Sequence, residues 1–460
     1  MVKTNKIRKL GTSSSKVNKL KGIFTKKHLL NSVSELNAII RGIEILAEKL
    51  PETIEYPISI KKENNSKNNS FSITYQQREL KPWIKAEWIT GEQLFQVGLT
   101  IIKQQAVLFE KGLCLIDARP ENYWLAKSHG VLIDLGSIKP LTRKNLLSYE
   151  TDFKNNFTNP LILEAELNLP VSQYFKGKIN STNINLWGIN RNLVSISFMK
   201  DALKNNFINF ISNLISSSSP EFIEFLNLES DSQKEVNISI KKSRGIVKKM
   251  KKKFNLLKPK IKNQSNWNNY ENFHDKEYNS KKLREIKKFV DINKSFSKIV
   301  DLGSNLTTKS IEHIDIRIDN DLLTSRKMRQ IHNTDKIILQ IDIADCICYS
   351  EDKKFNPLNC GGEAKVAVIT GLIHHLIIDY GLSIDDFYEK IAYLYRYVLL
   401  EFPSPDDPMV QLLIRKKNET INWDWNKMHL PLIKKFFQVQ KKTNLSPTRD
   451  IFQLKNIQFD

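Results

Sequence analysis

The sequence predicts a mixed α/β protein with two domains: a mostly helical α+β domain, followed by a domain built on a parallel sheet. From about residue 281, short β-like runs alternate with helical segments, which is typical of βαβ units. Residues 28–49 and 92–111 repeat apolar side chains near the helical period of about 3.6 residues. The length of 460 residues is enough for two or three domains of ordinary size.

Changes in composition along the chain suggest where the domains begin and end. The helix expected at 92–111 stops at Gly112, and glycine is a common helix end. We expect a basic flexible arm at residues 1–30 and a mostly helical domain at 31–235. A basic and polar connector is expected at 236–280, and an α/β domain at 281–460.

Basic residues are concentrated in two segments. The net charge is +21, and residues 1–30 and 241–262 hold nine and eleven Lys or Arg with no acids. The rest of the chain is therefore nearly neutral. Two basic segments on a neutral body favour solvated tail and connector, so nucleic acid is a possible partner but not the favoured one.

The composition excludes several classes of protein. With 40% hydrophobic and 26% charged residues, the chain is neither wholly disordered nor fibrous. Four cysteines do not build an extracellular disulfide framework, and the N-terminus has no apolar leader, which favours a cytoplasmic protein. The longest charge-free apolar run, 366–378, is too short for a membrane span.

Three apolar runs near the C-terminus each end in an acidic residue. The runs KIVDLGSN, IDIRIDND and KIILQID place Asp301, Asp319 and Asp342 at the ends of three expected strands. Because parallel sheets bind ligands at the carboxyl ends of their strands, these acids are expected at one edge. Gly303 lets the backbone approach a ligand, and Asp319, 18 residues after Asp301, is placed to bind ribose hydroxyls. The alternative for each run is a strand followed by a solvated acidic turn.

Two further strands lead to other candidate site residues. The run AKVAVIT precedes His374 and His375, where an imidazole could act as a general base or orient a substrate. The alternative is a packed or helix-capping histidine. Glu401, at the next strand end, could line a substrate-binding pocket with Asp406 and Asp407, or these acids could belong to a polar loop.

Three cysteines raise the question of a zinc site. Cys346, Cys348 and Cys360 lack a clean fourth ligand at a usual spacing. Reduced or structural cysteines are favoured, and no metal site is expected.

The order of these motifs resembles a known family. DLGSN, IDND, LQID, VITGLIHHLII and LLEFPSPDDPMV follow one another as in class I S-adenosylmethionine-dependent methyltransferases. More narrowly, Ile373–Leu376 and Glu401–Val410 resemble bacterial methyltransferase-like proteins of the nodulation protein NoeA-like group. The resemblance implies a Rossmann-like domain with S-adenosyl-L-methionine as cofactor. It also implies three sets of cofactor contacts. Asp301, Gly303 and Asn305 would line the cofactor loop. Asp319 would bind the ribose, and Asp342 would lie beside the adenine.

A second resemblance lies in the segment LCLIDARPENYWLAKSHGVLIDLGS, residues 113–137. Asp117 and Asn122 have the spacing of the catalytic loop of kinases, where the acid positions the hydroxyl and the amide binds metal. Asp134 stands where kinases carry a metal-binding acid. No Gly-x-Gly loop precedes this segment, and no strand carries a recognisable phosphate-binding lysine. We therefore expect a degenerate kinase-like domain in which Asp117, Asn122 and Asp134 are a remnant.

Together these patterns predict S-adenosylmethionine-dependent methyl transfer to an unidentified acceptor. Such transfer relies mainly on alignment of two bound reactants, so no dedicated nucleophile is needed. Two alternatives remain open: a non-catalytic binding or scaffold protein with degenerate methyltransferase and kinase-like folds, and an RNA-binding methyltransferase that uses the basic connector.

Overall fold

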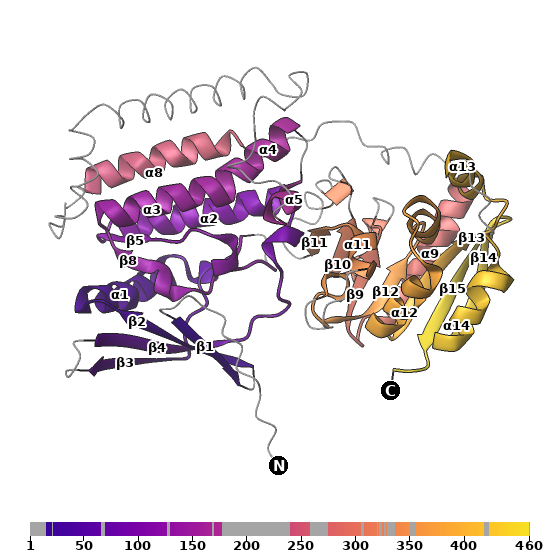
Figure 1. Cartoon of the computed structure of the whole chain (residues 1–460), viewed down its shortest axis with the longest axis horizontal. Helices are drawn as coiled ribbons and strands as arrows, with labels where there is room; N and C mark the ends of the chain where they lie inside the picture. The colour runs from indigo at the N-terminus through magenta and orange to yellow at the C-terminus, as the bar shows by residue number, and fades with distance from the viewer. Residues whose placement is uncertain are drawn as a thin grey trace, which may run out of the picture. The chain divides into compact units, whose positions relative to one another are not determined.

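The computed structural model shows a mixed α/β protein, as the sequence predicts (Figure 1). The chain divides into two compact units. The first unit is formed by residues 1–80, 94–124 and 129–259, and the second by residues 81–93, 125–128 and 260–460. The structure describes residues 15–20, 22–65, 70–126, 129–167, 170–176, 240–257, 275–304, 308–319, 321, 324–325, 328, 336–348, 356–417 and 423–459.

The first unit contains an antiparallel sheet in the strand order β1-β2-β4-β3. Its strands are β1 (Ser15–Leu20), β2 (Ile23–Leu30), β3 (Ser59–Asn65) and β4 (Ser70–Arg78). Two short hairpins follow, formed by β5 (Leu113–Leu115) with β8 (Ile138–Pro140) and by β6 (Tyr123–Trp124) with β7 (Val131–Leu132). The helices are α1 (Val33–Lys49), α2 (Gly91–Phe109), α3 (Arg143–Phe153), α4 (Asn159–Leu167), α5 (Val171–Phe175) and α8 (Ile240–Asn255).

Helix α1 forms where the sequence places an apolar stripe behind a good N-cap. The Ser32 hydroxyl accepts a hydrogen bond from the Glu35 N–H at 3.2 Å, and the Glu35 carboxylate accepts one from the Asn31 N–H. This reciprocal arrangement satisfies backbone donors that a helix start leaves open. The buried stripe of α1 is formed by Leu36, Ile39, Ile43 and Leu46.

The N-terminal segment differs from the flexible arm that we expected for residues 1–30. Strand β1 pairs along its whole length with β2, from Ser15↔His28 to Leu20↔Ile23, and β2 also pairs with β4. Four lysines of this segment lie on these two strands, and backbone pairing tolerates charged side chains on a solvated face.

The basic connector also contains folded structure. Helix α8 lies within the expected connector and packs on the first unit through Phe254, which stacks on Phe95 with ring centroids 5.1 Å apart. Gly98 makes room for this ring, because a Cβ atom there would come within 2.4 Å of Phe254. The connector therefore supplies an aromatic anchor as well as charge.

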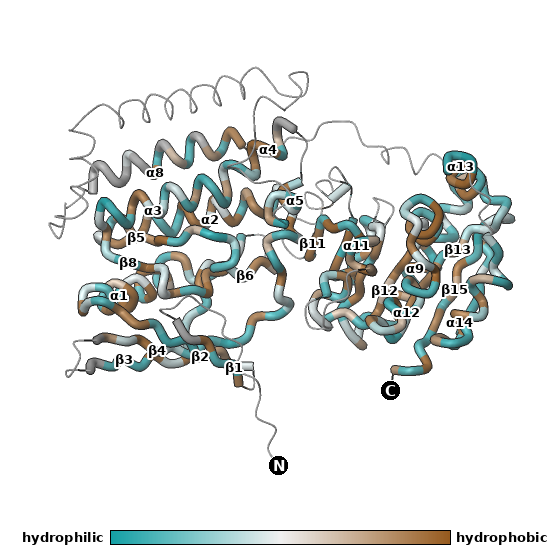
Figure 2. Tube along the Cα trace, viewed as in Figure 1, coloured by the Kyte–Doolittle hydropathy of each residue, from teal (hydrophilic) through white to brown (hydrophobic). Residues whose placement is uncertain are grey.

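The second unit is built on a seven-stranded sheet in the order β11-β10-β9-β12-β13-β15-β14. Neighbours from β11 to β13 are parallel, and β15 runs antiparallel to both strands that flank it. The strands are β9 (Lys298–Leu302), β10 (Ile316–Asp319), β11 (Ile337–Gln340), β12 (Ala364–Ile369), β13 (Tyr397–Pro403), β14 (Phe437–Ser446) and β15 (Arg449–Asn456). Strands β12 and β13 are rich in apolar residues, whereas β14 is largely polar (Figure 2).

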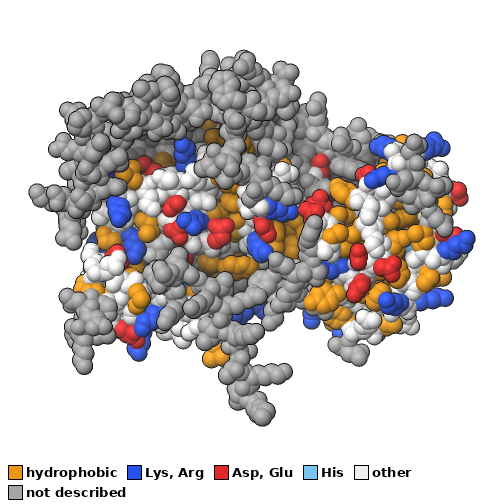
Figure 3. Space-filling view, viewed as in Figure 1, with side chains coloured by type: hydrophobic (Ala, Val, Ile, Leu, Met, Phe, Trp, Pro, Cys, Tyr) orange, Lys and Arg blue, Asp and Glu red, His pale blue; other side chains and the backbone are white. Residues whose placement is uncertain are grey.

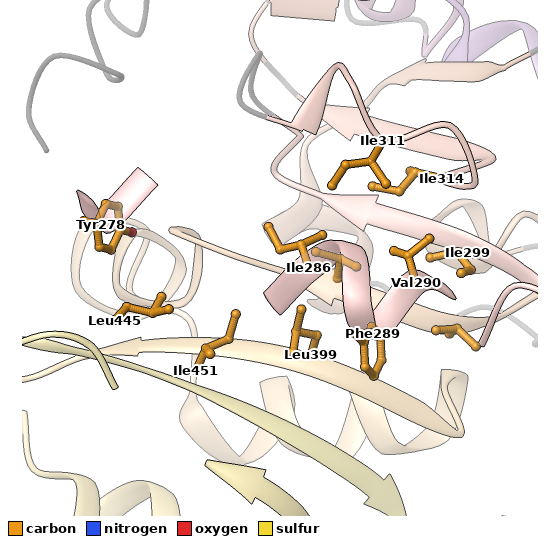
Figure 4. Close-up of a cluster of buried hydrophobic side chains, with 12 residues drawn as sticks. Tyr278, Ile286, Phe289, Val290, Ile299, Ile311, Ile314, Leu399, Leu445 and Ile451 are labelled. Atoms are coloured by element: carbon orange, nitrogen blue, oxygen red, sulfur yellow. The ribbon is translucent and has the colours of Figure 1, made fainter. Parts of the chain in front are cut away.

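Helices cover this sheet and close its core. Helix α9 (Lys276–Asn293) begins at the N-cap Asp275, before the domain start expected at residue 281. Its side chains Ile286, Phe289 and Val290 pack against the sheet residues Ile299 and Leu399, as Figure 4 shows. The other helices are α11 (Ile343–Cys348), α12 (Ile384–Leu394), α13 (Pro408–Lys417) and α14 (Leu430–Phe436).

The surface of the described residues is mixed in charge. On the face shown in Figure 3, acidic and basic side chains alternate with apolar ones. Among the described helices, none combines the length and the apolar character that crossing a membrane requires.

Candidate functional site

The strand order of the second unit creates a topological switch point. From β9 the chain steps outward to β10 and β11, then returns to the other side of β9 to form β12. Connections on the two sides of this point diverge, and ligands of open α/β sheets bind in the resulting crevice at the carboxyl ends of the strands. The acids that the sequence analysis selected lie at this edge.

The loop after β9 is tied to β10 at its start. The N–H groups of Gly303 and Ser304 both donate to the Ile318 carbonyl, at 2.9 and 3.0 Å. Gly303 has a φ of +72°, a conformation that favours glycine, and a Cβ atom there would lie 3.1 Å from Leu372. Glycine is therefore required for both reasons. Asn305, which the resemblance also assigns to this loop, lies outside the described residues.

Asp301 is buried beneath this loop. Its carboxylate accepts a hydrogen bond from the Thr308 hydroxyl at 2.6 Å and lies 3.6 Å from Arg317 Nη1. Burial raises the pKa of Asp301, and Arg317 acts against that shift. Because its carboxylate contacts Thr308 and Arg317, Asp301 helps to hold the loop in its conformation.

Arg317 is a structural residue that the sequence analysis missed. Its guanidinium donates to the Thr308 hydroxyl at 2.6 Å and to the carbonyls of Thr308 and Ile311 at 2.9 and 3.1 Å. It thus braces the returning part of the loop against β10. The sequence did contain an indication of this role, because an arginine in the middle of the apolar run IDIRID is unusual unless it is paired.

Asp319 and Asp342 lie at the carboxyl ends of neighbouring strands. Asp319 ends β10, is partly exposed and accepts a hydrogen bond from the Asp321 N–H at 2.7 Å. The Asp342 carboxylate accepts hydrogen bonds from the N–H groups of Ala344 and Asp345, at 3.0 and 3.3 Å. Asp342 therefore caps the start of α11.

His374 and His375 follow β12 and are both buried, with ring centroids 4.3 Å apart. Burial lowers the pKa of His375 to about 4, and the nearby Asp379 opposes this shift. At neutral pH the His375 imidazole is uncharged, so it can accept a proton.

Glu401 and Asp407 belong to a buried ion network. Glu401 pairs with Lys282 at 2.8 Å and with Arg449 at 3.0 Å, and it accepts a hydrogen bond from the Tyr278 hydroxyl. The Arg449 guanidinium also donates two hydrogen bonds to the Asp407 carboxylate, at 2.7 and 2.9 Å.

This network shifts the pKa of Glu401. It does not include Asp406, the third acid predicted for this region. Burial favours a raised pKa for Glu401, but Lys282 and Arg449 prevail and lower it to about 2. The carboxylates of Glu401 and Asp407 thus face cations of the same chain, whereas Asp406 is exposed. The network joins α9, β13 and β15 at the carboxyl end of β13.

In the first unit, the structure brings Asp117 and Asn122 together. The Asn122 amide donates to the Asp117 carbonyl at 2.7 Å and to its carboxylate at 3.2 Å. Asp117 has a φ of 56°, and its backbone N–H is hydrogen-bonded to Asp152 of α3. The Asn122 carbonyl accepts from the N–H groups of Ile133 and Asp134, at 2.9 and 3.3 Å, which links the two halves of the hairpin.

Side chains from the antiparallel sheet face the second half of this hairpin. Lys26 of β2 donates to the Ile133 carbonyl at 2.6 Å. The Tyr75 hydroxyl lies 3.4 Å from the Asp134 carboxylate, and His28 Nε2 lies 3.6 Å from it. Burial lowers the pKa of Lys26, and Asp134 opposes that shift.

This arrangement adds a residue to the hairpin that the sequence patterns did not identify. The sequence analysis recognised no strand lysine that could accompany the hairpin, and the structure places Lys26 beside Asp134. The FTKKHLL run contains two adjacent lysines, and only strand pairing shows which one faces the hairpin.

The cysteines are dispersed. Cys114 and Cys360 are buried, Cys346 is partly exposed and Cys348 is exposed. Within the part of the chain that the structure describes, no three or more His, Cys, Asp or Glu side chains are grouped so that they could hold a metal ion.

Comparison with known proteins gives little further information. No protein-family model and no curated protein matches the chain. Among solved structures, the chain is similar to the crystal structure of the PH0226 protein from Pyrococcus horikoshii OT3, with 14% identity and a TM-score of 0.25. The similarity covers 39% of this chain and 93% of that one. A likeness this low supports no functional argument, so the function must be inferred from the chain's own residues and topology.

Proposed function

We propose that the second unit is an S-adenosylmethionine-dependent methyltransferase domain that acts on an unidentified acceptor. The observation that carries this proposal is the strand order β11-β10-β9-β12-β13-β15-β14 with β15 as the reversed strand. Class I methyltransferases, which the sequence motifs resemble, have this order and this reversal. Other doubly wound nucleotide-binding sheets share the switch point but are described by other orders.

The residues at the switch point fit a nucleoside cofactor. The tight turn at Gly303 brings the backbone close to the crevice, and the partly exposed Asp319 lies at the carboxyl end of β10, where an acid binds ribose hydroxyls in nucleotide-binding sheets. When bound, S-adenosyl-L-methionine supplies a methyl group on a positively charged sulfur. The chain's own contribution is to hold the loop through Asp301 and Arg317 and to orient the ribose through Asp319.

The histidine pair follows β12, which borders β9 at the switch point. Burial keeps His375 uncharged at neutral pH, but a pKa of about 4 makes it a weak base, so we assign it to orienting the acceptor group rather than to removing its proton. His374 would orient that imidazole through ring contact. In this proposal Asp406, which is exposed, is the predicted substrate-binding acid best placed to meet an acceptor directly.

Calorimetric titration of the full chain with S-adenosylhomocysteine tests the proposal. Saturable binding with one site per chain is expected. If no heat of binding is detected at millimolar ligand, the methyltransferase proposal is wrong and the scaffold alternative gains support.

A second candidate function belongs to the first unit, and Lys26 favours it. Lys26, Asp134, Asp117 and Asn122 combine a buried amine, two carboxylates and an amide around one hairpin. Phosphate groups pair with amines, and Mg²⁺ prefers carboxylate oxygens. We propose that this kinase-like unit binds a nucleoside phosphate with Mg²⁺.

Fluorescence titration with a labelled ATP analogue, with and without Mg²⁺, tests this second function. Magnesium-dependent binding that Asp134→Asn abolishes is expected, while Asp385→Asn, at an exposed position of the second unit, serves as the control. Equal binding by the native chain and Asp134→Asn would reject the assignment.

A further inference from the structure

Gln340 is a buried amide without a partner. It ends β11, its side chain is 2% exposed, and neither carboxamide atom has a hydrogen-bond partner among the described residues. An unpaired buried amide is costly, and buried polar groups in native proteins are normally satisfied.

The fold satisfies a buried glutamine elsewhere in the chain. Gln104, which is fully buried in the first unit, donates to the Thr53 carbonyl at 2.8 Å and accepts from the Tyr123 hydroxyl at 2.7 Å. Gln104 is therefore paired through both carboxamide atoms, and the buried Gln105 is paired through its oxygen, which accepts from the Leu115 N–H at 2.9 Å, whereas Gln340 is paired through neither atom.

The register of the sheet places Gln340 next to the proposed ribose contact. Asp319 of β10 pairs with Gln340 of β11, and residues paired in a parallel ladder project from the same face. One pair earlier on that face, Arg317 lies beside Asp301. If Asp319 holds the ribose, its pairing with Gln340 brings the attached base within reach of the neighbouring strand β11.

The sequence analysis assigned the base to Asp342, which also follows β11. In the structure, two backbone N–H groups of α11 donate to one oxygen of the Asp342 carboxylate, Oδ1, so that this acid also caps the helix. Gln340 is the polar side chain of β11 that remains available.

We propose that the Gln340 carboxamide binds the adenine base of the cofactor and sets the specificity for adenine. This inference rests on the proposed methyltransferase function. A carboxamide offers one donor and one acceptor, and adenine presents its 6-amino donor beside an acceptor nitrogen on two edges. The N7–O6 edge of guanine presents two acceptors and would leave the carboxamide oxygen unpaired.

The first experiment compares S-adenosylhomocysteine with its analogue that lacks the 6-amino group, using calorimetry on the full chain. The native protein is expected to bind the analogue about tenfold more weakly, equivalent to about 1.4 kcal/mol. Gln340→Leu is expected to bind S-adenosylhomocysteine at least tenfold more weakly and to lose the preference between the two ligands. Such non-additivity identifies a direct contact between the varied groups.

The second experiment separates ligand recognition from a structural role. Without ligand, Gln340→Leu is expected to melt a few degrees above the native protein, because the unpaired amide is gone. The matched variant Gln104→Leu is expected to melt several degrees lower. If Gln340→Leu does not fold, Gln340→Met, of similar shape, takes its place in both experiments.

The outcomes distinguish the two proposals. If the native chain binds no S-adenosylhomocysteine, both proposals fail. If the native chain binds it but Gln340→Leu keeps the full preference for the 6-amino group, only the adenine assignment fails. A lowered melting temperature for Gln340→Leu together with unchanged binding would likewise show that Gln340 is structural.

Discussion

The guanidinium of Arg317 on β10 lies 3.6 Å from the carboxylate of Asp301 on β9, and both side chains are 1% exposed. The pair connects the two strands that flank the candidate cofactor loop. Thr308 completes the link, because its hydroxyl donates to Asp301 and accepts from Arg317, each at 2.6 Å. The charge pair thus determines the path of the loop that faces the switch point.

Removal of Arg317 should destabilise the protein strongly. Arg317→Met leaves the Asp301 carboxylate buried without its cation, and breaking a buried pair in this way costs about 3–5 kcal/mol. Urea denaturation followed by circular dichroism measures the loss in the free energy of unfolding. Arg415→Met, at an exposed position of α13, serves as the control and should change stability by less than about 0.5 kcal/mol. Similar losses in the two variants would show that Arg317 is not a brace.

The Glu401 network should make stability depend on pH under acidic conditions. The pKa of Glu401 is lowered from 4.5 to about 2 in the folded chain. A carboxylate with a lowered pKa stabilises the fold above its unfolded pKa, and this contribution is lost as the pH falls from about 4.5 to 2. At about 1.4 kcal/mol per pKa unit, the loss is roughly 3 kcal/mol.

The matched variant for this pH dependence is Glu401→Gln. It should be less stable than the native chain at pH 7, because Lys282 and Arg449 lose their anion, and the difference should shrink towards pH 2. Chemical denaturation at several pH values measures both chains. A difference that stays constant from pH 7 to pH 2 would contradict the assigned pKa.

The five parallel strands of the second unit, β9 to β13, could be predicted because each is a short apolar run with an acid or a turn residue at its end, whereas β14 is mostly polar and was not predicted. Asp301, Asp319 and Asp342 therefore reached their expected edge, since parallel strands align their carboxyl ends. Sequence spacing alone could not show what each side chain contacts. The Asp342 carboxylate caps a helix, and the Glu401 carboxylate meets Lys282 from α9, 119 residues earlier in the chain.

Other features depend on pairings between distant segments. Lys26 lies in a segment whose charge suggested an unstructured arm, and only its strand's pairing with β4 brings it to Asp134. Gln340 was visible as a polar residue inside the apolar run KIILQID. Its lack of a hydrogen-bond partner, on which the proposed role depends, can be seen only in the folded chain.

The docking of α8 should depend on its aromatic anchor rather than on its charges. Phe254 is 2% exposed and contacts Phe95 and Phe153, with ring centroids 5.1 Å from each. Phe254→Ala should therefore cost about 3–5 kcal/mol, as is usual for a buried phenylalanine. The triple variant with Lys248, Lys251 and Lys252 replaced by Gln should lose less than about 1 kcal/mol, because these side chains are exposed.

Thermal and urea denaturation measure both α8 variants, and calorimetry with S-adenosylhomocysteine measures their cofactor binding. The lysine variant should bind the cofactor as the native chain does. If it instead loses methylation of an acceptor while its cofactor affinity stays unchanged, the basic helix has a role in docking the substrate.

Asp319 gives the most direct test of the cofactor site. Its position at the end of β10 implies a charged hydrogen bond to the ribose, so Asp319→Ala should weaken S-adenosylmethionine binding by about 1.5–3 kcal/mol. This corresponds to a rise in the dissociation constant of roughly tenfold to more than a hundredfold, measured by isothermal titration calorimetry. The alanine also removes the acceptor of the Asp321 N–H, so Asp319→Asn, which keeps an acceptor oxygen, controls for local loop changes. Exposed Asp406→Ala should leave cofactor affinity unchanged. An unchanged dissociation constant for Asp319→Ala would show that the ribose is held elsewhere, and with it the base would lose its expected place over Gln340.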